Sequence, residues 1–125
     1  MKGKRRSGSA QIHITAGAER DLTGIYHRRL VQRGAEGADG ADVLLEKLAA
    51  AIESLAEFTN RGPIAPELAA LGIHDFHQLS HPPYRIIYLP QERDGGSQVT
   101  VMIVADSRRD FRTLLEERLL RDRRN

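Results

Sequence analysis

Two short runs of β-branched and aromatic residues constrain the fold of this chain more than any other feature. The first is Tyr84–Leu89 and the second is Gln98–Ala105, and both have the composition of strands. The segment between them, Pro90–Ser97, contains the Gly95-Gly96 pair that is typical of a turn. The spacing therefore predicts an antiparallel hairpin with a long loop over Pro90–Ser97.

Two stretches before this hairpin have helical periodicity. Apolar residues recur at three- and four-residue steps in Ala18–Gln32. They recur in the same way in a second stretch that begins at Asp39 or Asp42 and runs to about Phe58. The hydroxyl of Thr15 is predicted to cap the first helix. Two amphipathic helices joined by a short loop indicate an antiparallel helical hairpin.

The remaining elements complete a small α+β domain. They are strands at Gln11–Thr15 and Ile73–Leu79, a helical turn at Glu67–Leu71, and a last helix from a capping box at Ser107 and Asp110 to about Leu120. The expected order is β-α-α-β-β-β-α. We expect a small, mainly antiparallel twisted sheet with an N-terminal helical hairpin and a C-terminal helix, and with the helices on one face.

Length and composition narrow the class of protein. With 125 residues we expect a single domain at residues 11–120, between a flexible basic tail at 1–10 and a basic tail at 121–125. The chain has no cysteine, which excludes disulfides and thiolate chemistry and fits a cytoplasmic protein. No apolar run is long enough to span a membrane, and no apolar run follows the basic start, so neither a membrane contact nor a signal peptide is expected. The net charge is only +2, but the two basic ends could attract nucleic acid or an acidic protein, and the alternative is that they are solvated tails.

An arginine interrupts the first of the two strand-like runs. The alternation of a strand places Arg85 on the same face as Ile87 and Leu89. Burying a guanidinium without a partner is costly. Arg85 is therefore expected either to bind an anion in an open cleft or to form an ion pair with a nearby acid such as Asp75 or Asp106.

Three further arginines follow the second strand-like run. Arg108 and Arg109 are predicted at the start of the last helix, and Arg112 lies close behind them. Helix-start amides favour anions, and guanidinium groups bind phosphate or carboxylate through paired hydrogen bonds. These arginines are candidate contacts for such groups. The alternative is that nearby acids neutralise them at the surface, namely Asp106, Asp110 and Glu116.

The histidines and tyrosines offer fewer sites. His77 could serve as a general acid or base, a role for which the histidine side chain is suited, and the alternative is a plain surface histidine. His74 and His81 lie close to it in sequence, but the segment is predicted as strand and turn and no cysteine supports it, so no metal site is expected. Tyr84 and Tyr88 could stack on a base or pack in the core. Serine-nucleophile and nucleotide-loop motifs are absent, and no cofactor is expected.

Four segments of the chain together resemble a known family. They are Ile14–Leu22, Gly72–Leu79, Pro83–Tyr88 and Arg108–Phe111. Their order and spacing from Ile12 to Leu120 resemble the ParE/RelE toxin superfamily of bacterial type II toxin–antitoxin systems. The resemblance implies a growth-inhibiting toxin, with a small sheet flanked by a helical hairpin and a C-terminal helix. It also implies a hetero-oligomer with a cognate antitoxin, whose disordered segment folds over the toxin.

Two activities occur in that superfamily, and the chain resembles one branch more. ParE-like members poison DNA gyrase and need no catalytic residue, and the arginine pair at the start of a leucine-rich last helix resembles that branch. RelE-like members cleave messenger RNA on the ribosome. In that reading Arg85 and Arg108 would hold phosphate, and His77 would have to replace proton-transfer groups that are missing from the last helix. A gyrase inhibitor is therefore the preferred interpretation and a ribosome-dependent nuclease the alternative.

The same resemblance suggests which residues contact the target or the antitoxin. The expected contact residues are Arg85, Arg108, Arg109, Arg112, His77 and Tyr88. Acidic antitoxin residues are expected near Arg85, Arg108 and Arg109, because opposite charges pair across protein interfaces.

Overall fold

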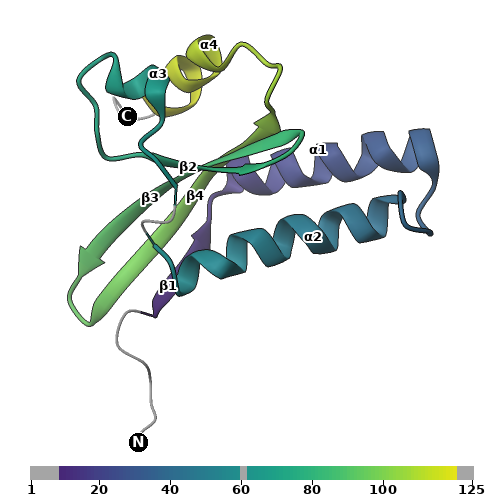
Figure 1. Ribbon diagram of the computed structural model, residues 1–125, viewed down its shortest axis with the longest axis horizontal. Helices are drawn as coiled ribbons and strands as arrows, with labels where there is room; N and C mark the ends of the chain where they lie inside the picture. The colour runs from purple at the N-terminus through teal and green to yellow at the C-terminus, as the bar shows by residue number, and fades with distance from the viewer. Residues whose placement is uncertain (1–8, 60–61, 121–125) are drawn as a thin grey trace, which may run out of the picture.

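A twisted four-stranded sheet forms the centre of the computed structural model, which describes residues 9–59 and 62–120 (Figure 1). Its strands are β1 (Ala10–Ile14), β2 (His77–His81), β3 (Tyr84–Arg93) and β4 (Gly96–Asp106), in the spatial order β1-β4-β3-β2. Only β1 and β4 pair in parallel. The predicted small, mainly antiparallel sheet is confirmed. Most of the two predicted tails, at 1–8 and 121–125, lies outside the described residues.

The predicted helical hairpin is present as α1 (Ala16–Arg33) and α2 (Ala41–Glu53), and a 3-10 turn, η1 (Ser54–Ala56), extends α2. The hydroxyl of Thr15 accepts the backbone N–H of Ala18 at 3.1 Å, which confirms the predicted cap.

α2 begins at Ala41, between the two predicted starts, and its N-cap is Gly40. Asp39 forms ion pairs at 3.2 Å with Arg29 and with Arg33. Asp42 lies inside the first turn, where its carboxylate accepts the hydroxyl of Tyr26 at 2.7 Å. Asp42 therefore attaches α2 to α1, and Asp39 attaches the loop before α2 to α1.

The second half of the chain contributes α3 (Pro66–Ala69), α4 (Phe111–Leu115) and a π-helical turn, η2 (Glu116–Leu120). The predicted start of the last helix at Ser107 is wrong. Asp110 is the N-cap, and its carboxylate accepts the backbone N–H of Thr113 at 3.3 Å and the hydroxyl of the same residue at 2.8 Å. Arg108 and Arg109 therefore precede the helix and lie on the connection that leads into it.

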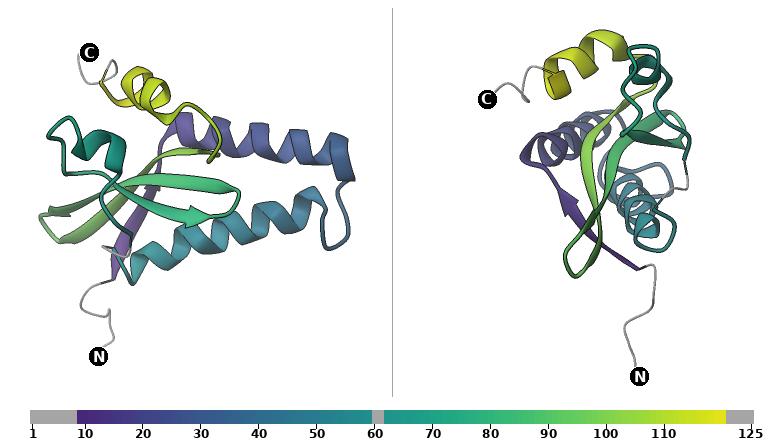
Figure 2. Two further views of the ribbon diagram at one scale, coloured as in Figure 1. Left: turned by 45° about the horizontal axis from the view of Figure 1, so that its top comes forward. Right: turned by 90° about the vertical axis from the view of Figure 1, so that its left-hand side faces the viewer.

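Helices cover both faces of the sheet, so the expectation of one covered face is wrong (Figure 2). One apolar cluster joins α1 and α2 to the face that carries Ile86 and Val101. A second cluster joins α3, α4 and η2 to the opposite face, which carries Ile87 and Ile103. Ile86 and Ile87 are neighbours on β3, and both are 0% exposed. A strand that buries consecutive residues needs a packing layer on each side.

Two strand boundaries also differ from the prediction. The predicted strand Ile73–Leu79 starts too early, because the N–H of Ile73 donates to the carbonyl of Leu68 at 2.9 Å and closes the turn after α3. The predicted long loop of the hairpin is likewise absent, since β3 continues through Pro90 and pairs with β4 up to a two-residue turn at Asp94–Gly95. β2 pairs with β3 only as far as Tyr88. Beyond that residue β3 is an edge strand, where a sheet tolerates proline.

No helix among the described residues is both long and apolar enough to cross a membrane. Within the same part of the chain, no three histidine, aspartate or glutamate side chains are grouped so that they could hold a metal ion.

Candidate functional site

Arg85 is held in a closed ion pair rather than facing an open cleft. Its Nη1 and Nη2 atoms each donate to one carboxylate oxygen of Glu67 at 2.9 Å, and the arginine side chain is only 13% exposed. The hydrogen bonds from Arg85 lower the pKa of the Glu67 carboxyl below its usual value. The ion pair suggested by the sequence therefore exists, but its partner is neither Asp75 nor Asp106. The reason is that α3 packs against this face of the sheet and brings Glu67 to the guanidinium.

Two further groups enclose the same guanidinium. Nη2 of Arg85 also hydrogen-bonds the side-chain oxygen of Gln78 on β2. The ring of Phe111 on α4 lies with its centroid 3.9 Å from Cζ, which is a cation–π contact. The Nε atom is buried and has no hydrogen-bond partner in the described part of the chain. Arg85 thus joins β2, β3, α3 and α4, and the outer fork of its guanidinium is already occupied.

The connection between β4 and α4 presents Arg108 to solvent. The carboxylate of Asp106 accepts three donors of Arg108: the backbone N–H at 2.8 Å, Nε at 3.0 Å and Nη2 at 2.9 Å. The Arg108 side chain nevertheless remains 85% exposed. The side-chain bonds of Arg108, followed by the backbone bond, lower the pKa of Asp106 to about 2. Asp106 is thus the partner of Arg108, as one of the two sequence interpretations proposed.

Two other predicted contact residues are exposed beside Arg108. Arg109 and Arg112 are both exposed, and neither side chain has a hydrogen-bond or ion-pair partner among residues 9–59 and 62–120. Asp110 and Glu116 were the other acids expected to neutralise them. Asp110 uses its carboxylate for Thr113 instead. The arginines after β4 therefore form a solvent-facing group, and Arg85 is separate from it.

His77 and Tyr88 each form a hydrogen bond with the backbone of the loop residue Gly62. Nδ1 of His77 lies 2.7 Å from the carbonyl oxygen of Gly62, so this nitrogen carries the proton and donates it. The N–H of Gly62 donates to the hydroxyl of Tyr88 at 3.1 Å, and the two rings stack with centroids 5.7 Å apart. Tyr88 is 0% exposed. Of the two residues, only His77 is accessible to a partner, and Tyr88 supports it from beneath.

A groove of about 800 Å³ lies on the sheet beside His77. Its apolar lining residues are Phe76, Leu89, Pro90 and Met102, and its polar ones are Thr59, His74, Asp75, His77, Gln91, Glu92, Ser97 and Gln98. Arg85, Arg108 and Arg109 are not among the lining residues. The groove therefore contains His77 without these three arginines, although the nuclease reading would place Arg85, Arg108 and His77 around one phosphate.

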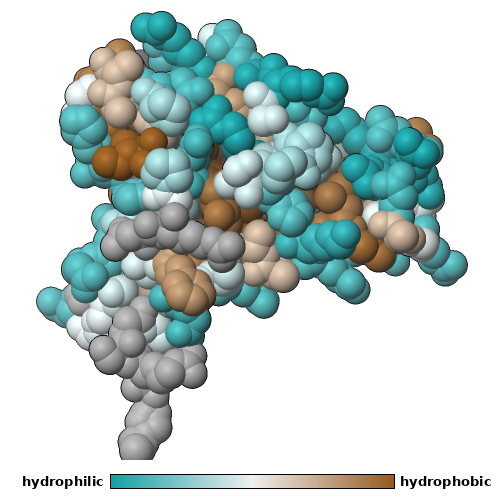
Figure 3. All heavy atoms as spheres, viewed as in Figure 1, coloured by the Kyte–Doolittle hydropathy of each residue, from teal (hydrophilic) through white to brown (hydrophobic). Residues whose placement is uncertain are grey.

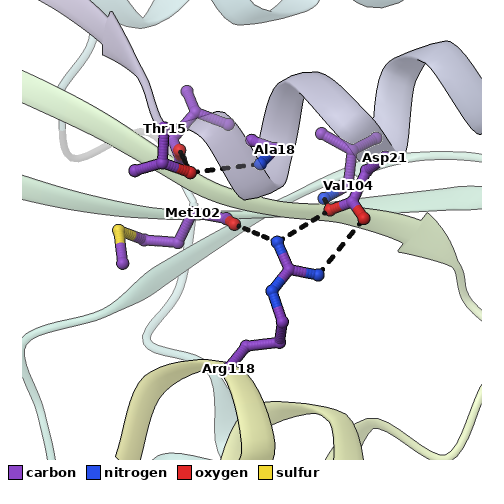
Figure 4. Close-up of polar contacts among 7 residues, drawn as sticks. Thr15, Ala18, Asp21, Met102, Val104 and Arg118 are labelled. Atoms are coloured by element: carbon purple, nitrogen blue, oxygen red, sulfur yellow. Dashed lines mark hydrogen bonds and ion pairs between the residues drawn. The ribbon is translucent and has the colours of Figure 1, made fainter. Parts of the chain in front are cut away.

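A cluster centred on Asp21 and Arg118 was not found from the sequence (Figure 4). Arg118 on η2 pairs with both carboxylate oxygens of Asp21 on α1 at 3.2 Å, and it donates to the carbonyl of Met102 at 2.9 Å. Asp21 also accepts the backbone N–H of Val104 at 3.0 Å. β1 has 5 residues and β4 has 11, so part of the β4 edge has no strand beside it. The difference in length between these two strands could have indicated that side chains must complete this edge.

A known family matches most of the chain. The family described as "ParE toxin of type II toxin-antitoxin system, parDE" matches residues 12–111. A comparison with curated proteins finds no match.

Two solved structures show the same fold at low sequence identity. A chain of the chromosomal ParDE toxin–antitoxin system from P. aeruginosa is 17% identical with a TM-score of 0.61, and the match covers 80% of this chain and 98% of that one. A chain of the RelBE2 toxin–antitoxin complex from Mycobacterium tuberculosis is 18% identical with a TM-score of 0.51, and the match covers 78% of this chain and 98% of that one. The predicted ParE/RelE-like fold is therefore confirmed.

Proposed function

Because this chain belongs to the ParE toxin family of type II toxin–antitoxin systems, we propose that it arrests growth by poisoning DNA gyrase without catalysing a reaction itself. The observation that carries the proposal is the ion pair between Arg85 and Glu67. A nuclease needs a free cation where charge develops on the phosphate. Here the outer fork of the strand arginine already holds a carboxylate, which favours a toxin that acts by binding.

The inner face of α4 supports the same choice. Phe111, Leu114 and Leu115 are buried there, and none of them can transfer a proton. Phe111 is also the residue whose ring lies against the guanidinium of Arg85. Cleavage of RNA through its 2′-hydroxyl requires a group that removes a proton and a group that donates one. The part of α4 that faces Arg85 offers neither.

We further propose that a cognate antitoxin neutralises the toxin in a hetero-oligomer. The titles of the two solved structures described above name a ParDE toxin–antitoxin system and a RelBE2 toxin–antitoxin complex. Acidic antitoxin residues are expected at Arg108 and Arg109, which are exposed. They are not expected at Arg85, because Glu67 already occupies it. Gyrase acts on the chromosome, so the proposed location is the cytoplasm.

The direct test uses purified toxin with gyrase and plasmid DNA. The proposal predicts loss of supercoiling and accumulation of cleaved DNA–gyrase complex, and both effects should disappear when the antitoxin is added. An Arg85→Met variant is a useful control, because a structural ion pair predicts that any variant that remains folded still inhibits gyrase. The proposal is contradicted if gyrase stays fully active in the presence of wild-type toxin.

One observation favours the alternative, a ribosome-dependent nuclease. His77 lines the groove, and its Nδ1 proton is committed to Gly62, which leaves Nε2 as the nitrogen that could accept a proton. This alternative predicts cut messenger RNA in a translating extract. It also predicts that His77→Ala and Arg108→Ala each abolish cleavage. Intact messages in the presence of growth-arresting toxin would exclude it.

A further inference from the structure

A group of exposed arginines lies where α1 passes the connection between β4 and α4. We define the α1–β4 basic surface as Arg28, Tyr84, Arg108 and Arg109. Tyr84 is the cross-strand partner of Asp106, and Arg108 binds the carboxylate of that acid. Arg28 on α1 is close enough to Asp106 that its charge contributes to lowering the pKa of the acid. Residues of α1, β3 and the connection after β4 therefore lie around the carboxylate of Asp106.

Backbone hydrogen bonds hold the connection in a fixed shape. The N–H of Ser107 donates to the carbonyl of Pro83 at 2.7 Å. The N–H of Arg108 donates to the carboxylate of Asp106 at 2.8 Å, and the N–H of Arg109 donates to the carbonyl of Asp106 at 3.0 Å. The two arginines therefore extend from an ordered backbone. Groups that are ordered beforehand lose less conformational entropy when a ligand binds.

The charge of this surface is only partly neutralised. Asp106 binds Arg108, whereas the side chains of Arg28 and Arg109 have no hydrogen-bond or ion-pair partner within residues 9–59 and 62–120. The rest of the domain is acidic. The segments 1–8 and 121–125 hold seven of the 19 Lys and Arg residues but one of the 17 acids, so residues 9–120 hold 12 against 16. The α1–β4 basic surface is thus a local exception and does not follow from the composition of the domain.

The side chains of the connection are suited to a phosphate backbone. The sequence from Asp106 to Asp110 is Asp-Ser-Arg-Arg-Asp, without an apolar side chain. Figure 3 shows hydrophilic residues gathered over this connection and over the adjoining part of α1. Protein partners are anchored mainly by aromatic and other large side chains in desolvated pockets. The sugar–phosphate backbone of DNA is held by arginines, lysines and other polar donors, with no need for an apolar pocket.

We propose that the α1–β4 basic surface binds the phosphate backbone of duplex DNA. Gyrase works on bound DNA, so a toxin that contacts both would bind the enzyme–DNA complex more tightly than either component alone. That consequence rests on the proposed function, whereas binding to DNA does not. Since each neutralised phosphate contributes about −0.9 to the slope of log affinity against log salt, three arginines should contribute a slope of roughly −2.7.

The test measures the affinity of the full chain for a short fluorescein-labelled DNA duplex by anisotropy, over a series of salt concentrations. The triple variant Arg28→Gln, Arg108→Gln, Arg109→Gln is compared with a charge-matched variant that carries Arg29→Gln, Arg33→Gln, Lys47→Gln on the helical hairpin. The first variant is expected to lose roughly tenfold in affinity and two to three units of salt slope. The second is expected to change affinity less than about twofold.

Two results would overturn the proposal. One is that the two triple variants lose affinity equally, because the effect would then be one of net charge. The other is that the first variant loses affinity but keeps the salt slope of the wild type, because the three arginines would then not neutralise phosphates. If the first variant does not fold by circular dichroism, the pair Arg28→Gln, Arg109→Gln replaces it, since neither side chain has a described partner. Gyrase assays with wild-type toxin test the proposed function separately, so each proposal can fail alone.

Discussion

At the scale of single residues, Gly62 occupies a position with no room for a side chain. A Cβ atom there would lie 1.6 Å from the carbonyl oxygen of Gln78. Both backbone groups of Gly62 are also engaged, with His77 and Tyr88. The backbone could move away from Gln78 only by breaking these bonds. The loop therefore depends on glycine for close approach, not for a special backbone angle.

Replacing Gly62 with alanine is expected to lower the free energy of unfolding by about 3 kcal/mol, because the strand and the loop must separate. Urea denaturation measures this loss. Gly72→Ala is the matched control, since Gly72 has a φ of +81° and no atom within 4 Å of an added Cβ. Its cost should be about 1 kcal/mol, from backbone strain alone. Equal losses for the two variants would mean that steric overlap at Gly62 is relieved in solution.

The ion pair of Asp106 predicts how stability depends on pH. The folded pKa of Asp106 is about 2, below its usual value of 3.8. A carboxyl with a lowered folded pKa contributes stability that is complete above its unfolded pKa and lost as the pH falls through the folded value. This contribution should therefore disappear between about pH 4 and pH 2.

The variant Arg108→Gln isolates that contribution. The difference in urea midpoint between wild type and Arg108→Gln should be largest above about pH 4 and should shrink as the pH approaches 2. Asp106→Asn should remove the same part of the pH dependence, because it removes the titrating group. A difference that stays constant down to pH 2 would contradict a folded-state ion pair as its source.

At the scale of elements, the edge of β4 is completed by side chains where β1 ends. β1 pairs with Ser97–Val101 only. Beyond that segment, Asp21 accepts the N–H of Val104, and Arg118 donates to the carbonyl of Met102. The same two side chains pair with each other, so α1, β4 and η2 meet at one ion pair (Figure 4). The last element of the described chain is thereby attached to the sheet edge.

A double-mutant cycle measures this attachment. Asp21→Ala and Arg118→Ala should each destabilise the protein by about 2–3 kcal/mol, because each leaves a partly buried charge and a backbone group unpaired. The double variant should cost less than the sum of the two, with a coupling energy of about 1–2 kcal/mol. Arg29→Ala and Asp39→Ala provide the comparison, since Asp39 is 65% exposed and surface pairs couple by less than about 1 kcal/mol. Additive losses for Asp21 and Arg118 would show that the two residues act independently.

The same elements show what could be predicted from the sequence. The helical hairpin, the Thr15 cap and the paired strands were predicted because each depends on a repeating pattern or on a contact a few residues away. The partner of Arg85 and the Asp21–Arg118 pair were not, because they join residues 18 and 97 positions apart. At the candidate site, Arg108 and Asp106 are two residues apart, and this pairing was among the alternatives. Contacts between residues close together in the sequence could be predicted, whereas contacts between layers depend on the fold.

At the scale of the whole molecule, two apolar clusters share one sheet. Leu48 on α2 belongs to the first cluster and is 0% exposed, and Leu115 on α4 belongs to the second and is 1% exposed. Ile86 and Ile87 extend from consecutive positions of β3 into opposite clusters. Because β3 contributes to both, loss of packing on one face must affect the strand that supports the other. The domain should therefore unfold as a single cooperative unit.

Leu48→Ala and Leu115→Ala test this coupling. Each should lower the free energy of unfolding by about 2–5 kcal/mol, because each leaves a cavity in a close-packed cluster. Leu45→Ala on α2 is the control and should cost much less, since Leu45 is 36% exposed. Native-state hydrogen exchange locates the effect. If the clusters unfold together, Leu115→Ala accelerates exchange of the most protected amides in α1 and α2 as much as in α4. If α1 and α2 keep their wild-type protection while α4 and η2 lose theirs, the second layer opens by itself, and a partner could reach Arg85 by displacing α4 without unfolding the toxin.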